Sequence, residues 1–433
     1  MLRNMTGFRS LARNRDFTHL WIGQTVSELG SQVSMFVFPL VAYAISGSTI
    51  HAAAAEALYL SGFAVALLPA GVLADRVDRR RLMRGASAGG VLLYTSLTAA
   101  GVLGTITLPH LLAVALLTGA AAGVFAPSEM AAVRAVVPTD DLPTALSQNQ
   151  ARQHVAGLLG APVGGLLFAV TRWLPFAVDA VTFAVSWVLL GRIKADLSPP
   201  PYDGPRRHVL DDLRQGIGFI VRQPFFRVLM AWGALSNLAV NALFFLAILR
   251  LIQGGFEPVA IALVSTAAGA CGILGALVAP WLIERTPTGR LTVVIAWSFV
   301  PLSVPMIFWN HPAVVAAALS AGIFLNPAGN AGIQSYRLSI TPPDLLGRVQ
   351  SASQFVGMSA MPLAPVVAGL TLSLWGGQVA TAAITGLCVL VALVPTSSRA
   401  VRSVPKPSEW AGSPTGPGKE TADTRHLDRE LVG

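Results

Sequence analysis

Residues 71–84 have the sequence Gly71-Val-Leu-Ala-Asp75-Arg76-Val-Asp78-Arg79-Arg80-Arg81-Leu-Met83-Arg84. This short stretch carries five arginines and two aspartates and lies between two long apolar runs. Charged side chains are costly in the hydrocarbon core of a membrane, so the stretch has to lie in water. Because cytoplasmic loops of membrane proteins carry an excess of Lys and Arg, it is interpreted as a tight cytoplasmic turn between the second and third transmembrane helices.

The composition predicts an all-α, polytopic membrane protein. Of the 433 residues, 53% are hydrophobic and only 12% are charged, whereas a soluble protein carries about 25% charged residues. The apolar runs are long enough to cross a hydrocarbon core of about 30 Å as helices. They are continuous rather than alternating, which argues against transmembrane strands. The net charge of +9 follows from Lys and Arg in predicted cytoplasmic loops, so no nucleic-acid partner is expected.

The apolar runs predict twelve spans in two bundles of six. The predicted spans are residues 17–45, 51–74, 82–106, 111–137, 145–170, 174–193, 225–249, 258–283, 290–309, 313–338, 346–371 and 376–395. The predicted outer loops hold only Arg172 and Arg250, so both termini are expected in the cytoplasm. We expect a monomeric multi-pass protein of the cell (plasma or inner) membrane.

The spans divide the chain into five predicted parts. These are a cytoplasmic N-terminal segment at 1–16, a first bundle at 17–193, a cytoplasmic linker at 194–224, a second bundle at 225–395 and a disordered cytoplasmic tail at 396–433. Within the linker, residues 210–222 have the periodicity of an amphipathic helix that lies on the membrane surface.

The two predicted bundles also resemble each other in sequence. Leu73-Ala-Asp75-Arg76 recurs, weakened, as Leu282-Ile-Glu284-Arg285 between the eighth and ninth spans. Asp141-Leu142, which precedes the fifth span, matches Asp344-Leu345, which precedes the eleventh. Two such matches at equivalent places indicate an internal duplication, as many transporters have.

The segment from Gly71 to Arg80 resembles the loop 2–3 signature of the major facilitator superfamily, with Asp78 at a position that usually holds glycine. That variant is similar to the branch of enterobactin exporters and macrolide efflux proteins. Gly160-Ala-Pro-Val-Gly-Gly-Leu-Leu167 and Arg214-Gln-Gly-Ile-Gly-Phe-Ile-Val-Arg-Gln-Pro224 support that branch. The resemblance covers about residues 10–395 and implies two six-helix bundles around a cavity that opens alternately to each side. In the fifth span Pro162 lies one residue later than in the antiporter motif, which weakens an inference of export from that motif.

The arginine-rich turn is predicted to act as a conformational latch, a contact that stabilises the outward-facing state and breaks when the cavity opens inward. Asp75 can accept hydrogen bonds from a helix N-terminus of the other bundle, where the helix dipole favours an anion. Arg76, Arg79 and Arg80 can bridge to acidic groups, and Gly71 belongs to the same motif. The alternative is that these arginines only fix the topology.

Three carboxylic acids within the spans are candidates for proton coupling: Glu28, Asp179 and Glu129. An ionisable group at membrane depth is a functional candidate because its burial is costly. Glu28 lies about ten residues into the first span, roughly 15 Å along the helix. The alternative for Glu28 and Asp179 is a structural hydrogen bond to a neighbouring helix. Glu129 clusters with Arg134, Arg152 and His154, as a charge network or as side chains that reach the interface.

Uncharged polar residues are candidates for the wall of a substrate cavity. These residues are Gln24, Asn237, Asn241, Asn326, Asn330 and Gln334. The asparagines of the seventh span are four residues apart, and the polar residues of the tenth span repeat at the same interval. Hydrogen bonds between helices are the alternative for both stripes.

The sequence holds no phosphate-binding loop, no His/Cys metal cluster and no nucleophile–base arrangement, so neither an enzyme, a cofactor nor a bound metal is expected. The two cysteines, Cys271 and Cys388, lie in apolar runs as packing residues. The leading hypothesis is a proton-coupled secondary transporter that exports an amphiphilic small molecule, such as a drug or a siderophore-like metabolite. The alternatives are an uptake or facilitative carrier of a small solute and a non-transporting membrane sensor or assembly protein.

Overall fold

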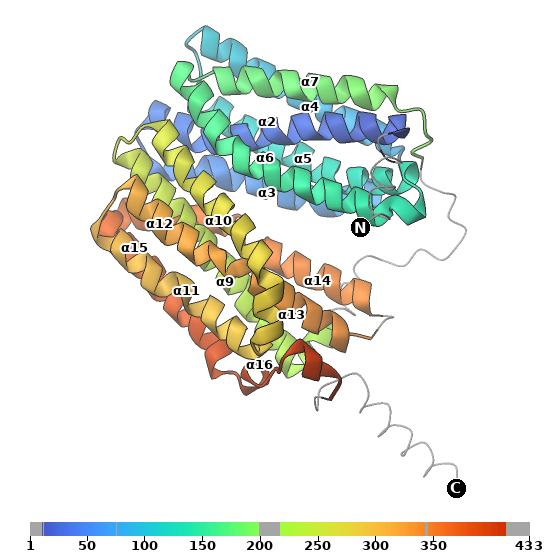
Figure 1. Ribbon diagram of the computed structural model, residues 1–433. Coiled ribbons are helices and arrows are strands. Elements are labelled where there is room, and N and C mark those ends of the chain that lie inside the picture. The colour runs from blue at the N-terminus through green and yellow to red at the C-terminus, as the bar shows by residue number, and fades with distance from the viewer. Residues whose placement is uncertain (1–10, 12, 75, 199–216, 343–344, 413–433) are drawn as a thin grey trace. The chain divides into compact units, whose positions relative to one another are not determined.

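The computed structural model describes residues 11, 13–74, 76–198, 217–342 and 345–412 (Figure 1). Every regular element within these ranges is a helix. Among the described residues, ten helices are long and apolar enough to cross a membrane. The helix α4 (Arg79–Val102) adds another span, and Gly376, with φ 73°, divides α15 (Leu363–Ser397) into two. The predicted all-α fold with twelve spans is therefore confirmed.

The described residues form two compact units. Unit 1 contains residues 1–203, 245–266 and 362–376, and unit 2 contains residues 204–244, 267–361 and 377–433, in each case where the structure describes them. The predicted bundles at 17–193 and 225–395 group helices that are consecutive in the sequence. The two units instead group residues that contact one another in space. The boundaries of the predicted bundles stay a prediction, and residues 199–216 of the linker lie outside the described residues.

Six helices make up most of unit 1, and they run side by side (Figure 1). They are α2 (Arg15–Ser46), α3 (Thr49–Ala74), α4, α5 (Leu108–Val136), α6 (Leu142–Val170) and α7 (Leu174–Arg192). A 3-10 turn, η1 (Thr139–Asp141), precedes α6. Small residues let α3 and α5 approach closely, because Gly119 lies against the Tyr59 carbonyl and Gly62 against that of Leu116. The pattern is typical of helix packing in lipid, where close van der Waals contact drives association.

The remaining helices contribute to both units. They are α9 (Pro224–Gln253), α10 (Pro258–Arg285), α11 (Thr288–Phe308), α12 (Pro312–Phe324), α13 (Asn326–Ile340), α14 (Leu346–Ser359) and α15. The helices α12 and α13 together form one span of 29 residues. In unit 1, the segments at 245–266 and 362–376 pack on the six N-terminal helices: Gly165 faces Pro258 and Ala262, and Gly369 faces Ala53.

Residues 396–412 differ from the predicted disordered tail. They continue α15 to Ser397 and then form α16 (Arg399–Arg402) and the 3-10 turn η2 (Pro407–Gly412). The indole of Trp410 packs on Tyr336 with ring centroids 5.4 Å apart, and the Gly289 N–H donates to the Val404 carbonyl at 3.1 Å. The buried apolar side chains of Val401 and Val404 hold this segment against unit 2. The rest of the predicted tail, residues 413–433, lies outside the described residues.

Asp179 ties α7 to α2 in the core of unit 1. It is fully buried and accepts hydrogen bonds from Ser34 Oγ at 2.6 Å and Thr182 Oγ1 at 2.8 Å. Gly30 lies directly opposite, where an added methyl group would overlap both Asp179 and Thr182. Since Asp179 has two donors and a close-packed neighbour, this geometry favours the structural alternative for Asp179 over proton coupling.

Gly30→Ala is expected to destabilise the protein by about 1–3 kcal/mol relative to Gly89→Ala, because it overpacks the Asp179 contact. At Gly89, in α4, an added methyl group meets no atom within 4 Å. The matched change therefore controls for the higher helix propensity of alanine. Thermal unfolding of the detergent-solubilised variants, followed by circular dichroism, measures the difference. Equal melting temperatures would contradict the close contact.

Candidate functional site

The arginine-rich turn connects α3 to α4 and contacts the segment that follows α7. Asp78 caps α4 by accepting the Arg80 N–H at 2.8 Å. The Arg80 guanidinium donates to the Ala195 carbonyl, and the Arg79 N–H donates to the Leu197 carbonyl at 3.3 Å. These two arginines therefore cross-link parts of unit 1.

The segment that follows α7 is also bonded to the start of α2. Both carboxylate oxygens of Asp16, at the start of α2, accept backbone N–H groups, from Lys194 and from Ala195, each at 2.9 Å. The backbone N–H of Ser198 lowers the pKa of the exposed Asp196 below its usual value. Fixed hydrogen bonds thus define the path of the chain as it leaves α7.

The other three predicted latch residues are Asp75, Arg76 and Gly71. Asp75 lies outside the described residues. Arg76 is exposed, and Gly71 is half-buried in the last turn of α3. A methyl group on Gly71 would meet no atom within 4 Å, so close packing does not account for glycine there. The latch remains a proposal for these three residues and for Arg79 and Arg80.

Glu129 and Arg152 form an ion pair between α5 and α6. Arg152 Nη2 lies 2.7 Å from Glu129 Oε1, and the exposed fractions of the two side chains are 1% for Arg152 and 15% for Glu129. Arg152 Nε and Nη1 have no hydrogen-bond acceptor among the described residues. Arg134 and His154, which the sequence grouped with this pair, are exposed. The buried part of the predicted charge network is therefore Glu129 with Arg152.

Glu28 lies near this pair. It is half-buried in α2 and accepts a hydrogen bond from Gln32 Nε2 at 3.1 Å. Its carboxylate interacts electrostatically with that of Glu129. The α2 backbone at Gln32 also packs closely on Gly160 of α6. Glu28, Glu129 and Arg152 thus bring three ionisable groups from three helices into one electrostatic cluster, which we term the charge cluster.

Gln24 was predicted to line a cavity, but its side chain is buried and lies 3.5 Å from Ser186 Oγ of α7. The amide of Asn241 donates to the Asn237 carbonyl at 2.7 Å, and Gln334 Nε2 donates to Gln350 Oε1 at 2.9 Å. The bond of Gln334 joins α13 to α14, as the alternative for its stripe predicts, whereas that of Asn241 stays within α9.

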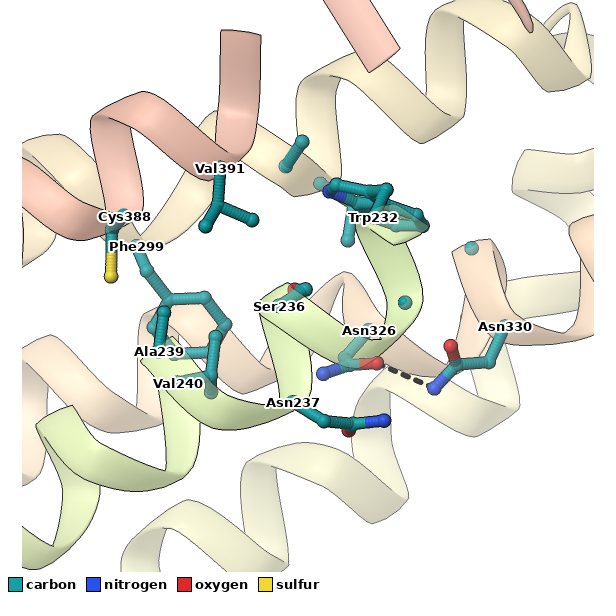
Figure 2. A pocket seen from close by; sticks show the side chains of 14 residues that line it. Trp232, Ser236, Asn237, Ala239, Val240, Phe299, Asn326, Asn330, Cys388 and Val391 are labelled. Atoms are coloured by element: carbon teal, nitrogen blue, oxygen red, sulfur yellow. Dashed lines mark hydrogen bonds between the residues drawn. The ribbon is translucent and has the colours of Figure 1, made fainter. Parts of the chain in front are cut away.

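The other three polar candidates line one pocket of about 140 Å³ in unit 2. Figure 2 shows Asn237 on α9 beside Asn326 and Asn330 on α13, with Asn330 Nδ2 donating to Asn326 Oδ1 at 2.6 Å. Residues of α11 and α15 complete the wall, among them Phe299 and Cys388. The two predicted asparagine stripes therefore meet at a single site.

Sequence reasoning missed Trp232 and Cys388 as lining residues of this pocket. Trp232, Ser236 and Val240 are spaced four apart, so a common helical face was the available signal for Trp232. The sequence carried no such signal for Cys388, because the spacing within a long apolar helix does not show which face of the helix lines a pocket. Within the described ranges, no three His, Cys, Asp or Glu side chains are grouped as metal ligands would be.

The comparisons with known proteins concern the family and the fold. A family model described as Major Facilitator Superfamily matches residues 20–365. No curated protein matches the chain in a sequence comparison. A bacterial homologue of the human lysosomal transporter Spinster, inward-facing and unoccupied, is similar with a TM-score of 0.69 and 13% identity, over 90% of this chain and 98% of the other.

Two further solved structures are also similar. A bacterial homologue of the iron transporter ferroportin, in an inward-facing state, has a TM-score of 0.67 and 15% identity over 91% of this chain and 99% of the other. The nucleoside transporter NupG has a TM-score of 0.69 and 10% identity over 89% and 98%. At such identities these likenesses describe the fold.

Proposed function

Because this chain belongs to the Major Facilitator Superfamily, we propose that it is a proton-coupled secondary transporter that exports an amphiphilic small molecule by alternating access. The similar structures are transporters or homologues of transporters, but their names cover a lysosomal transporter, a nucleoside transporter and an iron transporter. Iron and nucleosides share no chemistry, so the substrate proposed here depends on the residues of this chain.

The charge cluster is the observation that carries the proposal. A buried ion pair is strongly destabilised when one partner loses its charge, because the other is left uncompensated. Protonation of Glu129 would release Arg152, and protonation of Glu28 would remove a negative charge that acts on Glu129. Proton binding therefore changes the contacts between α2, α5 and α6, and this change can favour one conformation of the transporter over the other.

Alternating access also needs a contact that differs between the two states of the transporter. We propose that the arginine-rich turn provides it: Asp75, with Gly71, Arg76, Arg79 and Arg80, would stabilise the outward-facing conformation.

The orientation and location are part of the same proposal. The five arginines of residues 76–84 support a cytoplasmic position for the turn and, with twelve spans, for both termini. We propose a monomer in the cell membrane, with a small-molecule substrate and protons as its partners.

Export and proton coupling can be tested together. Cells that lack their own efflux pumps are first screened for compounds whose toxicity the protein reduces. Inside-out vesicles with an acid interior should then accumulate such a compound, and a protonophore should stop the accumulation. A flux that is the same with and without the pH gradient would contradict proton coupling. Accumulation driven in the opposite direction would indicate uptake, and no flux of any compound would contradict transport.

A further inference from the structure

We infer that unit 2 contains a binding site for an uncharged, ring-sized chemical group that accepts a hydrogen bond from the indole of Trp232. The site is the pocket between α9, α11, α13 and α15 that Figure 2 shows. All of its lining residues belong to unit 2, and none of them belongs to the charge cluster.

The hydrogen-bond donor of Trp232 carries the inference. Trp232 is buried, with 8% of the residue exposed, yet its Nε1–H has no acceptor among the described residues. A buried donor without a partner costs about 1–3 kcal/mol, so such groups are uncommon and point to a missing partner. In Figure 2 the Trp232 ring borders the pocket, with its nitrogen on the side that faces Val391.

The wall of the pocket defines the chemistry of the ligand. All 14 lining residues are uncharged, so an ionised group placed there would lose hydration with no opposite charge to replace it. Phe299, Val391 and Ala239 provide apolar surface on one part of the wall, while Asn237 and Asn326 provide amides on another. This division suits a neutral group with an apolar ring and one carbonyl, ether or hydroxyl oxygen.

The volume sets the size of that group. The pocket measures about 140 Å³, and an engineered apolar cavity of about 150 Å³ binds benzene. One six-membered ring with a small substituent therefore fits, whereas a larger amphiphile would place only one end there. That this end belongs to the exported molecule rests on the proposed transport function; the binding site itself does not.

Indole NMR tests the site directly. The protein has nine tryptophans, and the signal of Trp232 is identified by its loss in Trp232→Phe. Acetophenone, which has a carbonyl acceptor, is compared with α-methylstyrene, which has the same shape without the oxygen. Trp297 is the internal control, because its Nε1–H already donates to Thr396 Oγ1 at 3.0 Å. All measurements use the full chain in lipid nanodiscs.

Acetophenone is expected to move the Trp232 indole proton downfield, to leave Trp297 in place and to bind about two- to tenfold more tightly than α-methylstyrene, the range for one net hydrogen bond. Equal shifts and affinities for both compounds would overturn the assigned hydrogen bond, and no shift with either would overturn the site.

Cys388 gives a second measurement on the same pocket. In the Cys271→Ser background it is the single thiol, and its alkylation by N-ethylmaleimide is followed by mass spectrometry. Acetophenone is expected to slow this alkylation, and Trp232→Phe should reduce the protection to the level of α-methylstyrene. Unchanged protection in Trp232→Phe would contradict the role of the indole. Both assays measure binding alone, so their results do not depend on whether the protein transports the compound. Transport of a substrate by a protein that fails both binding assays would contradict this site and not the proposed function.

Discussion

Glu28→Gln is expected to reduce proton-driven transport about tenfold or more while the protein remains folded in the membrane, since a neutral amide of the same shape cannot bind and release a proton. Glu28 is half-buried, bonds to Gln32 and interacts electrostatically with Glu129. The variant should retain substrate exchange that needs no net proton movement. Flux in proteoliposomes with and without an imposed pH gradient measures both activities.

A matched control is Glu409→Gln, because Glu409 is exposed in η2, outside the spans and the proposed sites. This control should transport as the unmodified protein does. If Glu28→Gln responded fully to the pH gradient, Glu28 would not be a coupling residue, and Glu129 would be the remaining carboxylate of the charge cluster to test. Loss of exchange together with loss of coupling would indicate damage to the fold instead.

Arg152→Gln is expected to destabilise the protein by up to about 3–5 kcal/mol, because it leaves the largely buried carboxylate of Glu129 without its partner. The ion pair spans 2.7 Å, and only 1% of the Arg152 side chain is exposed. The double variant Arg152→Gln, Glu129→Gln should recover much of this loss, since two neutral amides can bond to each other. Thermal unfolding in detergent compares the single and double variants.

Arg134→Gln serves as the control for Arg152→Gln. Arg134 is exposed on α5, the helix that also carries Glu129, so removal of its charge should change the melting temperature little. A double variant as unstable as the sum of the two single variants would show that Glu129 and Arg152 act independently. In that case the ion pair could not transmit protonation between α5 and α6.

The fold was largely predictable from sequence because membrane insertion imposes simple rules. Each apolar run had to become a helix of spanning length, and the arginines of residues 76–84 set the turn between α3 and α4. The tail was harder to predict. Residues 399–412 are polar and rich in proline, yet Val401, Val404 and Trp410 pack on unit 2. Composition gives the average polarity of a segment, whereas a few apolar side chains at suitable positions determine whether the segment packs on the helices.

The site was predictable only in part, because a sequence gives the spacing of residues along a helix but not the rotation of that helix. Asn326 and Asn330 lie one turn apart on α13, and they do line a pocket together. Gln334 continues the same spacing but bonds to Gln350. The pairing of Glu129 with Arg152 depends on the packing of α5 against α6. These distinctions arise from tertiary contacts between helices.

The hydrogen bonds of Asp16 bear on how such a chain could have evolved. They join the start of α2 to residues 194 and 195, just after α7, so the six-helix segment begins and ends at the same place. A segment whose ends meet can be joined to a tandem copy of itself without rearrangement of its interior, for the same reason that proteins with adjacent termini tolerate circular permutation. Gene duplication would then need to supply only a connector. The repeated Leu73-Ala-Asp75-Arg76 and Leu282-Ile-Glu284-Arg285 stretches are what such an event would leave behind.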